Sequence, residues 1–104
     1  MRSVSPSSAG RRRKDAEWKA QVLTLAGLHC ERCPQDARSL PLDPHHVWGK
    51  LAHPALRHVV ENGACLCRLC HGWIHDNPIE GRKWFAEHRT EDWLVVEKLR
   101  MEAQ

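Results

Sequence analysis

Two Cys-x-x-Cys pairs limit most strongly what this chain can fold into. Cys30 and Cys33 form the first pair, and Cys67 and Cys70 form the second. Pairs of this kind are typical of a tetrahedral zinc site, in which each tight turn brings two thiolates to about 2.3 Å from one ion. We therefore predict a structural zinc site with four protein ligands and no position left for a substrate. The remaining cysteine, Cys65, is expected to be a small buried side chain.

With 104 residues the chain is expected to form one domain, and so small a core gains stability from a bound metal. The first residues lack the apolar segment of a secretory signal, and no apolar run is long enough to span a membrane. We therefore expect a soluble cytoplasmic protein that has no membrane partner. In the cytoplasm, paired cysteines favour metal binding over disulfides.

The formal net charge of +3 conceals an uneven distribution of charge. Residues 1–14 carry five basic side chains and no acidic one, whereas the remaining residues carry 11 basic and 13 acidic side chains. We predict that residues 1–14 form a disordered basic tail and that residues 15–104 form the folded domain, with Asp15 as the cap of its first helix. Such a tail suits a polyanion such as nucleic acid, although charge alone fits a solvated terminus without a partner equally well.

The 33 residues between the two cysteine pairs are too many for the connector of a simple zinc ribbon. Pro41 and Pro44 exclude a helix there and favour an extended segment that contains His45 and His46. Adjacent residues of an extended chain point to opposite faces, so we expect one of these histidines to bind a metal and the other to stay free. Asp43, just before them, is either a partner of a histidine or a turn former.

The residues after the second cysteine pair have a helical pattern. His71 and His75 lie four residues apart, share one helix face and can hold one metal ion together. Further helical segments are expected at residues 82–85 and 91–102, with Thr90 as the cap of the last one. We interpret this C-terminal part as packing. The apolar side of its last helix is expected to consist of Leu94, Val95 and Leu99.

Together these segments resemble the HNH endonuclease family, in the branch whose nuclease motif is braced by a four-cysteine zinc site. The resemblance rests on CERC, PHHVW, the asparagine of VENGACLC, and CRLCHGWIH, which span residues 30–75 in the order and spacing of the family. Small proteins of this kind are common in phage and prophage genomes. The resemblance implies a small α+β fold with a ββα-metal (His-Me finger) core, in which two antiparallel strands and a helix hold one divalent ion, with flanking helices.

The resemblance also assigns roles to individual residues. It implies that His46 is the general base that takes a proton from water, and that Asn62 holds the loop of His46 in place. It implies that the catalytic metal is bound by His45, His71 and His75. The structural zinc is then bound by Cys30, Cys33, Cys67 and Cys70.

The chemistry of phosphodiester hydrolysis also favours these residue types. It needs a base with a pKa near neutrality, which imidazole provides at about 6.5, and a cation that neutralises the charge on the phosphorane. Three neutral imidazoles favour zinc, nickel or manganese over magnesium as the catalytic ion. The candidate DNA contacts are Arg11, Arg12, Arg13, Lys14, Lys50, Arg57 and Arg68.

The sequence therefore predicts a metal-dependent endonuclease that hydrolyses DNA, with one nicking centre per chain, in the cytoplasm of a bacterial host cell. A double-strand break would require a homodimer or two visits, and phage packaging proteins are candidate partners. The alternative is a zinc-stabilised DNA-binding or phage assembly module without turnover, which would need neither His46 nor Asn62. A weaker alternative makes the second metal site purely structural.

Overall fold

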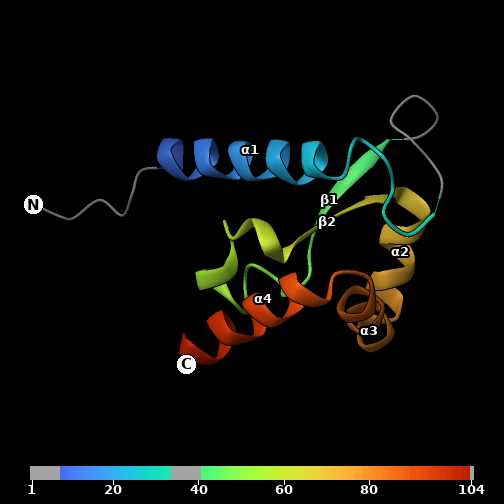
Figure 1. Ribbon diagram of the computed structural model, residues 1–104. Helices are drawn as coiled ribbons and strands as arrows, with labels where there is room; N and C mark the ends of the chain where they lie inside the picture. Colours follow the sequence, from blue (N-terminus) through green and yellow to red (C-terminus); the bar gives the residue numbers. More distant parts are fainter. Residues whose placement is uncertain (1–7, 34–40, 104) are drawn as a thin grey trace, which may run out of the picture.

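The computed structural model describes residues 8–33 and 41–103, and every structural statement below concerns these residues. The elements are, in chain order, α1 (Ser8–Leu25), β1 (Leu42–His46), the short 3-10 helices η1 (Pro54–Leu56) and η2 (Val60–Asn62), β2 (Gly63–Cys67), α2 (Arg68–Asp76), α3 (Pro78–His88) and α4 (Thr90–Glu102). The fold is thus small α+β, as predicted. Figure 1 shows α1 on one side of the molecule and α4 on the other, with η1 and η2 between them.

Helix α1 begins at Ser8, well before the predicted cap at Asp15. Residues 8–14 are therefore helical, which corrects the expectation of a disordered tail over residues 1–14; residues 1–7 lie outside the described residues. Arginine and lysine are good helix formers, and this preference outweighs the repulsion between their charges along the segment. Asp15 cannot cap a helix that runs through it.

The second half of α1 packs against the sheet. Trp18 and Val22 are 2% and 3% exposed and lie against Cys65 of β2, which is fully buried as predicted. Gly63 makes this close approach possible, because a Cβ atom there would overlap Val22 and lie 2.9 Å from Cζ2 of Trp18. Trp18 and Val22 are therefore core residues, and the helix ends just before Gly27, where the backbone φ is 68°.

Strands β1 and β2 form a two-stranded antiparallel sheet. In its register His45 is paired with Ala64, and His46 is paired with Gly63. Both histidines therefore lie opposite a residue with a small side chain or none, which leaves space beside each imidazole ring. The extended segment predicted around the two prolines is confirmed as β1.

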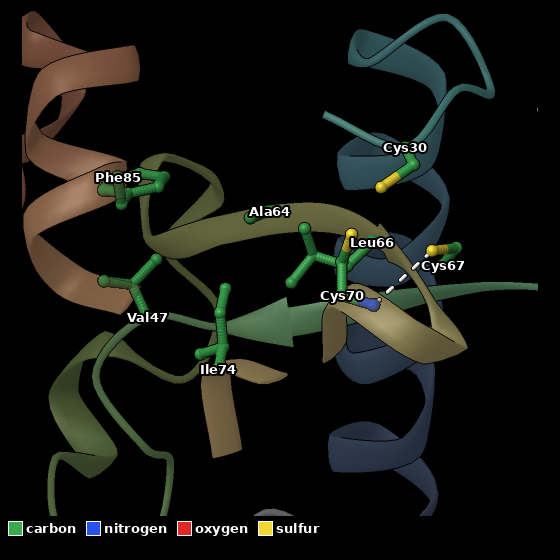
Figure 2. Close-up of a cluster of buried hydrophobic side chains, with 8 residues drawn as sticks. All are labelled: Cys30, Val47, Ala64, Leu66, Cys67, Cys70, Ile74 and Phe85. Atoms are coloured by element: carbon green, nitrogen blue, oxygen red, sulfur yellow. Dashed lines mark hydrogen bonds between the residues drawn. The ribbon is translucent and has the colours of Figure 1, made fainter. Parts of the chain in front are cut away.

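A second buried cluster joins the other face of the sheet to α2 and α3 (Figure 2). Leu66 of β2 packs there with Ile74 of α2 and Phe85 of α3, and the cysteines of the two pairs border the cluster. Helix α2 ends before Asn77 and Pro78, as the helix-breaking proline requires. Helix α3 is longer than the segment predicted from residues 82–85.

Two predictions for the last helix are wrong. Thr90 is the first residue of α4 and Arg89 occupies the cap position; the hydroxyl of Thr90 donates to the carbonyl oxygen of Ala86 and so does not cap α4. Leu94 and Val95 are 63% and 41% exposed, whereas Val96 is fully buried. The apolar stripe was misplaced because the rotation of α4 is set by its packing on α3 and the 3-10 helices, which helical periodicity alone does not reveal.

Arg89, between α3 and α4, ties the C-terminal helices to the first cysteine loop. Its guanidinium donates to both carboxylate oxygens of Glu31, to the carboxylate of Asp92 and to the backbone oxygen of Gly63. Glu31 in turn accepts from the backbone N–H of Cys65 at 2.7 Å. This network fixes the first cysteine loop against the sheet. Among the described residues, no helix is long and apolar enough to cross a membrane.

Candidate metal centres and active site

Four cysteine sulfurs converge between the loop after α1 and the start of α2. The Sγ atoms of Cys30, Cys33, Cys67 and Cys70 lie within 4.8 Å of one another, and those of Cys33 and Cys67 are 3.6 Å apart. Tetrahedral zinc with bonds of about 2.3 Å places its sulfurs about 3.8 Å apart, so these side chains could hold one zinc ion, as predicted. Figure 2 shows three of the sulfurs at one end of the buried cluster.

Burial raises the pKa values of the Cys30 and Cys70 thiols, whereas hydrogen bonds from nitrogen donors lower them. The backbone N–H of Cys33 donates to Sγ of Cys30 at 3.4 Å, and hydrogen bonds of this kind outweigh burial and lower the pKa of Cys30. Burial raises the pKa of Cys70, although the guanidinium of Arg32 lies 3.6 Å from its sulfur and opposes the rise. A bound cation would let every member of the set ionise, so the donor set fits a metal better than four free thiols.

Three imidazoles converge immediately beyond this cysteine cluster. His45 comes from β1, while His71 and His75 come from successive turns of α2, and their ring nitrogens lie within 4.8 Å of one another. The Nε2 atoms of His71 and His75 are 3.1 Å apart. Metal–nitrogen bonds of about 2.1 Å place neighbouring ligands about 3.0–3.4 Å apart, so this spacing fits two ligands of one ion.

The surroundings of His45 and His71 favour the state in which histidine binds metal. Burial, followed by the charges of His71 and His75, lowers the pKa of His45 to about 3, so its ring is neutral at physiological pH. The carboxylate of Asp43 lies 3.1 Å from Nδ1 of His71. A carboxylate accepts the Nδ1 hydrogen, which leaves the lone pair on Nε2, the atom that faces His75. Of the two interpretations of Asp43, the histidine partner is the one that its contacts favour.

His46 lies on the opposite face of β1 from His45. Its ring stacks on that of Trp18, with centroids 3.9 Å apart and planes inclined by 6°, whereas the ring of His45 lies 5.1 Å from that of His71. The prediction that the two adjacent histidines point in opposite directions is confirmed. One face of the strand therefore belongs to the three-histidine cluster, and the other belongs to α1.

A backbone carbonyl determines which ring nitrogen of His46 carries the hydrogen. Nε2 of His46 lies 3.0 Å from the carbonyl oxygen of Arg57. A carbonyl oxygen only accepts hydrogen bonds, so Nε2 is the donor and Nδ1 of the neutral ring is the atom that can accept a proton. Burial lowers the pKa of His46, although the bond to Arg57 opposes this change. The ring is thus in the form that a general base requires.

Asn62 holds the loop that follows His46. Its side-chain oxygen accepts from the backbone N–H of Trp48 at 2.9 Å, and its nitrogen donates to the carbonyl oxygens of Trp48 and Leu56 at 3.0 and 3.2 Å. The side chain is fully buried. These contacts close the long loop between β1 and β2, and they are the contacts expected of Asn62.

A basic cleft of about 450 Å³ lies between α1 and the loop that joins the strands. Four of the seven candidate DNA contacts line it: Arg11, Lys14, Lys50 and Arg57. Residues on α1 and in the loop are about 40 positions apart in the chain, so only the fold brings their charges together. Arg12 and Arg13 are exposed on α1 but do not line this cleft, and Arg68 lies apart from it at the start of α2.

Two of the candidate DNA contacts are already paired with carboxylates. The guanidinium of Arg57 makes two hydrogen bonds of 2.9 and 2.8 Å to Asp15, so it is less available to a phosphate than we predicted. Arg68 lies 3.2 Å from Asp43, but it is 70% exposed and this pair is weak. Lys50, Arg11 and Lys14 are therefore the more suitable phosphate contacts of the cleft.

Sequence reasoning missed two residues that contact this site from α1. Asp15 was predicted only to cap a helix, and Trp18 was given no role at the site, yet Trp18 stacks on His46 and Asp15 binds Arg57. Asp15 carried one usable signal, because it is the first acidic residue after a long basic segment. Nothing in the sequence links either residue to His46.

Comparisons of this chain with protein-family models, with curated proteins and with solved structures find no match. The resemblance to HNH endonucleases therefore stays a prediction that rests on the residues of the chain itself.

Proposed function

We propose that this protein is a metal-dependent endonuclease that hydrolyses phosphodiester bonds of DNA, and more specifically a zinc-braced nuclease of the HNH type. The observation that carries the proposal is that the two adjacent histidines of β1 lie in different surroundings. His45 joins His71 and His75 in a cluster suited to a metal, while the next residue, His46, presents a neutral imidazole whose Nε2 is held by a carbonyl. Two adjacent histidines with separate, complementary surroundings fit a hydrolytic centre better than a purely structural site.

The cysteine and histidine clusters suit different tasks. Four thiolates would fill the coordination sphere of zinc, which makes that site structural. Three imidazoles would leave a position open for water or phosphate, and a divalent ion held there would neutralise the charge that grows on the phosphorane and the leaving oxygen. Zinc, nickel and manganese suit nitrogen donors better than magnesium does.

His46 would act as the general base. With its hydrogen on Nε2, the ring takes a proton from the attacking water at Nδ1 and becomes an imidazolium. The bond from Nε2 to Arg57 keeps this tautomer in place throughout the transfer. Asn62 would support His46 indirectly, because its three hydrogen bonds hold the loop that carries Arg57. One such base per chain implies that each chain cuts one strand.

The basic cleft supports DNA as the substrate. Lys50 and Arg57 contribute to the electrostatic environment of His46, so the cleft and the proposed base are neighbours. A phosphate backbone drawn into a groove of Arg11, Lys14 and Lys50 would therefore pass beside His46. Charge complementarity of this kind is independent of base sequence, so it indicates a nucleic-acid substrate without indicating a recognition site.

The direct test is cleavage of supercoiled plasmid by zinc-loaded protein in the presence of added manganese, nickel or magnesium. We expect nicked circles to accumulate before linear DNA, and we expect a chelator of the added ion to stop the reaction. Tight DNA binding with no cleavage under any of these ions would instead favour the second candidate, a zinc-stabilised DNA-binding or phage assembly module without turnover.

Neutralising the cleft should weaken DNA binding. In the triple variant Arg11→Gln, Lys14→Gln, Lys50→Gln, the slope of log affinity against log salt should fall by about 2.7, because each lost phosphate contact contributes about 0.9. The measurement is a fluorescence titration of duplex DNA without added divalent ion, so that cleavage does not interfere. The control triple Lys19→Gln, Lys83→Gln, Lys98→Gln removes the same charge from exposed positions outside the cleft. Equal slopes for the two triples would show that the cleft binds no DNA.

A further inference from the structure

We infer that helix α1 belongs to the catalytic centre, and that Trp18 and Asp15 are positioning residues that hold the His46 imidazole in its ring plane and tautomer. The inference rests on the proposed function and deepens it, because it adds two residues outside the segments that resemble the nuclease family. Both residues lie in one turn of α1. Trp18 contacts the imidazole directly, and Asp15 binds the guanidinium of Arg57, whose carbonyl oxygen accepts a hydrogen bond from that imidazole.

Trp18 restrains the plane of the His46 ring. The two rings are nearly parallel, with centroids 3.9 Å apart, and Nε1 of Trp18 donates to the carbonyl oxygen of Val59 at 2.8 Å. The indole is 2% exposed and packs beside Val22. It is therefore held by a hydrogen bond at its nitrogen and by packing along its edge, so it forms a fixed wall against one face of the imidazole.

The sheet provides the space that this stacking needs. Gly63 is the residue paired with His46 across the two strands. A Cβ atom on Gly63 would lie 2.9 Å from Cζ2 of Trp18 and would overlap Val22. The position opposite His46 is thus open for the indole only because it carries no side chain. This arrangement accounts for the close approach of α1 to β1 at the proposed base.

Asp15 acts on the imidazole indirectly, through Arg57. Its carboxylate receives two hydrogen bonds from the guanidinium of Arg57, and one of its oxygens lies 2.6 Å from Nε2 of His58. The carbonyl oxygen of Arg57 is the acceptor that keeps the hydrogen of His46 on Nε2. The hydrogen bond from Arg57 holds the pKa of Asp15 well below its usual range, so the carboxylate is charged at neutral pH.

Two variants separate positioning from ordinary packing. Asp15→Ala removes the anchor of Arg57 from a partly exposed turn, and Glu17→Ala is its control on the exposed face of the same helix. Trp18→Leu removes the stacked indole, and Trp84→Leu is its control because Trp84 also stacks on a histidine, but on His88 rather than on His46. If Trp18→Leu does not fold, Asp15→Ala carries the test alone.

The readouts are the kinetics of DNA nicking and the ¹⁵N chemical shifts of the His46 ring. For Asp15→Ala and Trp18→Leu we expect kcat to fall by about 10- to 100-fold with no rise in KM, because a catalytic group displaced by about 1 Å can lose that much rate. In wild type the shifts should report hydrogen on Nε2. In Asp15→Ala they should move toward a mixture of tautomers, and both controls should behave as wild type.

Unchanged kcat and unchanged His46 shifts in Asp15→Ala would overturn the inference. Wild-type protein that cleaves no DNA would overturn the proposed function instead, and the ¹⁵N shifts would then decide the positioning of His46 by themselves. A loss of Nε2 protonation in Asp15→Ala but not in Glu17→Ala would support the positioning role of Asp15. Identical ¹⁵N shifts in the two variants would refute that role.

Discussion

Replacing His46 by alanine is expected to reduce the rate of plasmid nicking by about 100- to 10,000-fold, which is the usual contribution of a positioned general base. The substitution removes the imidazole that stacks on Trp18 and donates to the Arg57 carbonyl, while it leaves the three-histidine cluster intact. Metal binding and DNA affinity should therefore stay near the wild-type values. The measurement is the initial rate of conversion of supercoiled to nicked plasmid at saturating added metal.

His88→Ala is the matched control for this variant. His88 also stacks on a tryptophan, with a centroid distance of 5.1 Å to Trp84, and its Nε2 also has an oxygen partner, on Glu31. Loss of this histidine removes a similar set of contacts from a different part of the molecule. If His46→Ala cut DNA as fast as His88→Ala, His46 would not be the base.

The largest effect on stability is expected from Cys67→Ala. Removing one of the four sulfurs should abolish stable zinc binding, and the chain should lose cooperative thermal unfolding, since structural zinc contributes roughly 10–16 kcal/mol of apparent binding energy in small domains. The two cysteine pairs border the main buried cluster, so the effect should reach Leu66 and Phe85. Zinc content by atomic absorption and a thermal scan measure both consequences.

Cys65→Ala tests whether the zinc or the lost volume is responsible. Cys65 and Cys67 lie on the same strand and are both fully buried, but only Cys67 belongs to the sulfur cluster. Cys65→Ala should retain its zinc and lose only about 1 kcal/mol of unfolding free energy through the small cavity. Equal destabilisation of the two variants, with equal zinc content, would mean that the cluster does not hold the ion.

Local patterns in the sequence were sufficient to predict the members of the two clusters that could hold a metal ion. Cysteine spacing identified the first set, and the i, i+4 spacing of His71 and His75 identified the helical part of the second. The prolines at 41 and 44 predicted an extended segment, and its alternation correctly separated His45 from His46. Each of these signals depends on neighbours within a few residues, which is why it can be recognised without the fold.

Contacts between distant segments could not be predicted in this way. Asp15 and Arg57 are 42 residues apart, and Glu31 and Arg89 are 58 apart, yet these pairs fix α1 and the first cysteine loop. The helical state of residues 8–14 and the exposure of Leu94 also depend on context, because propensity and tertiary packing decide them. The supporting residues of the site were therefore missed, although its proposed ligands were not.

The adjacency of Cys70 and His71 links the two proposed metal sites. Cys70 lies in the first turn of α2 and His71 follows it directly, so a zinc ion on the cysteines would fix the start of the helix that presents His71 and His75. In this account the closed site stabilises the chain and also sets the position of the open one.

The most direct test of the account measures metal content and nicking on one purified sample of wild type and of His71→Ala. We predict that wild type binds one tightly held zinc and one exchangeable divalent ion and nicks plasmid. We predict that His71→Ala keeps the zinc but loses both the exchangeable ion and the nicking activity. Undiminished nicking by His71→Ala, or a single bound metal in active wild-type protein, would contradict the claim that the three histidines form the catalytic metal site.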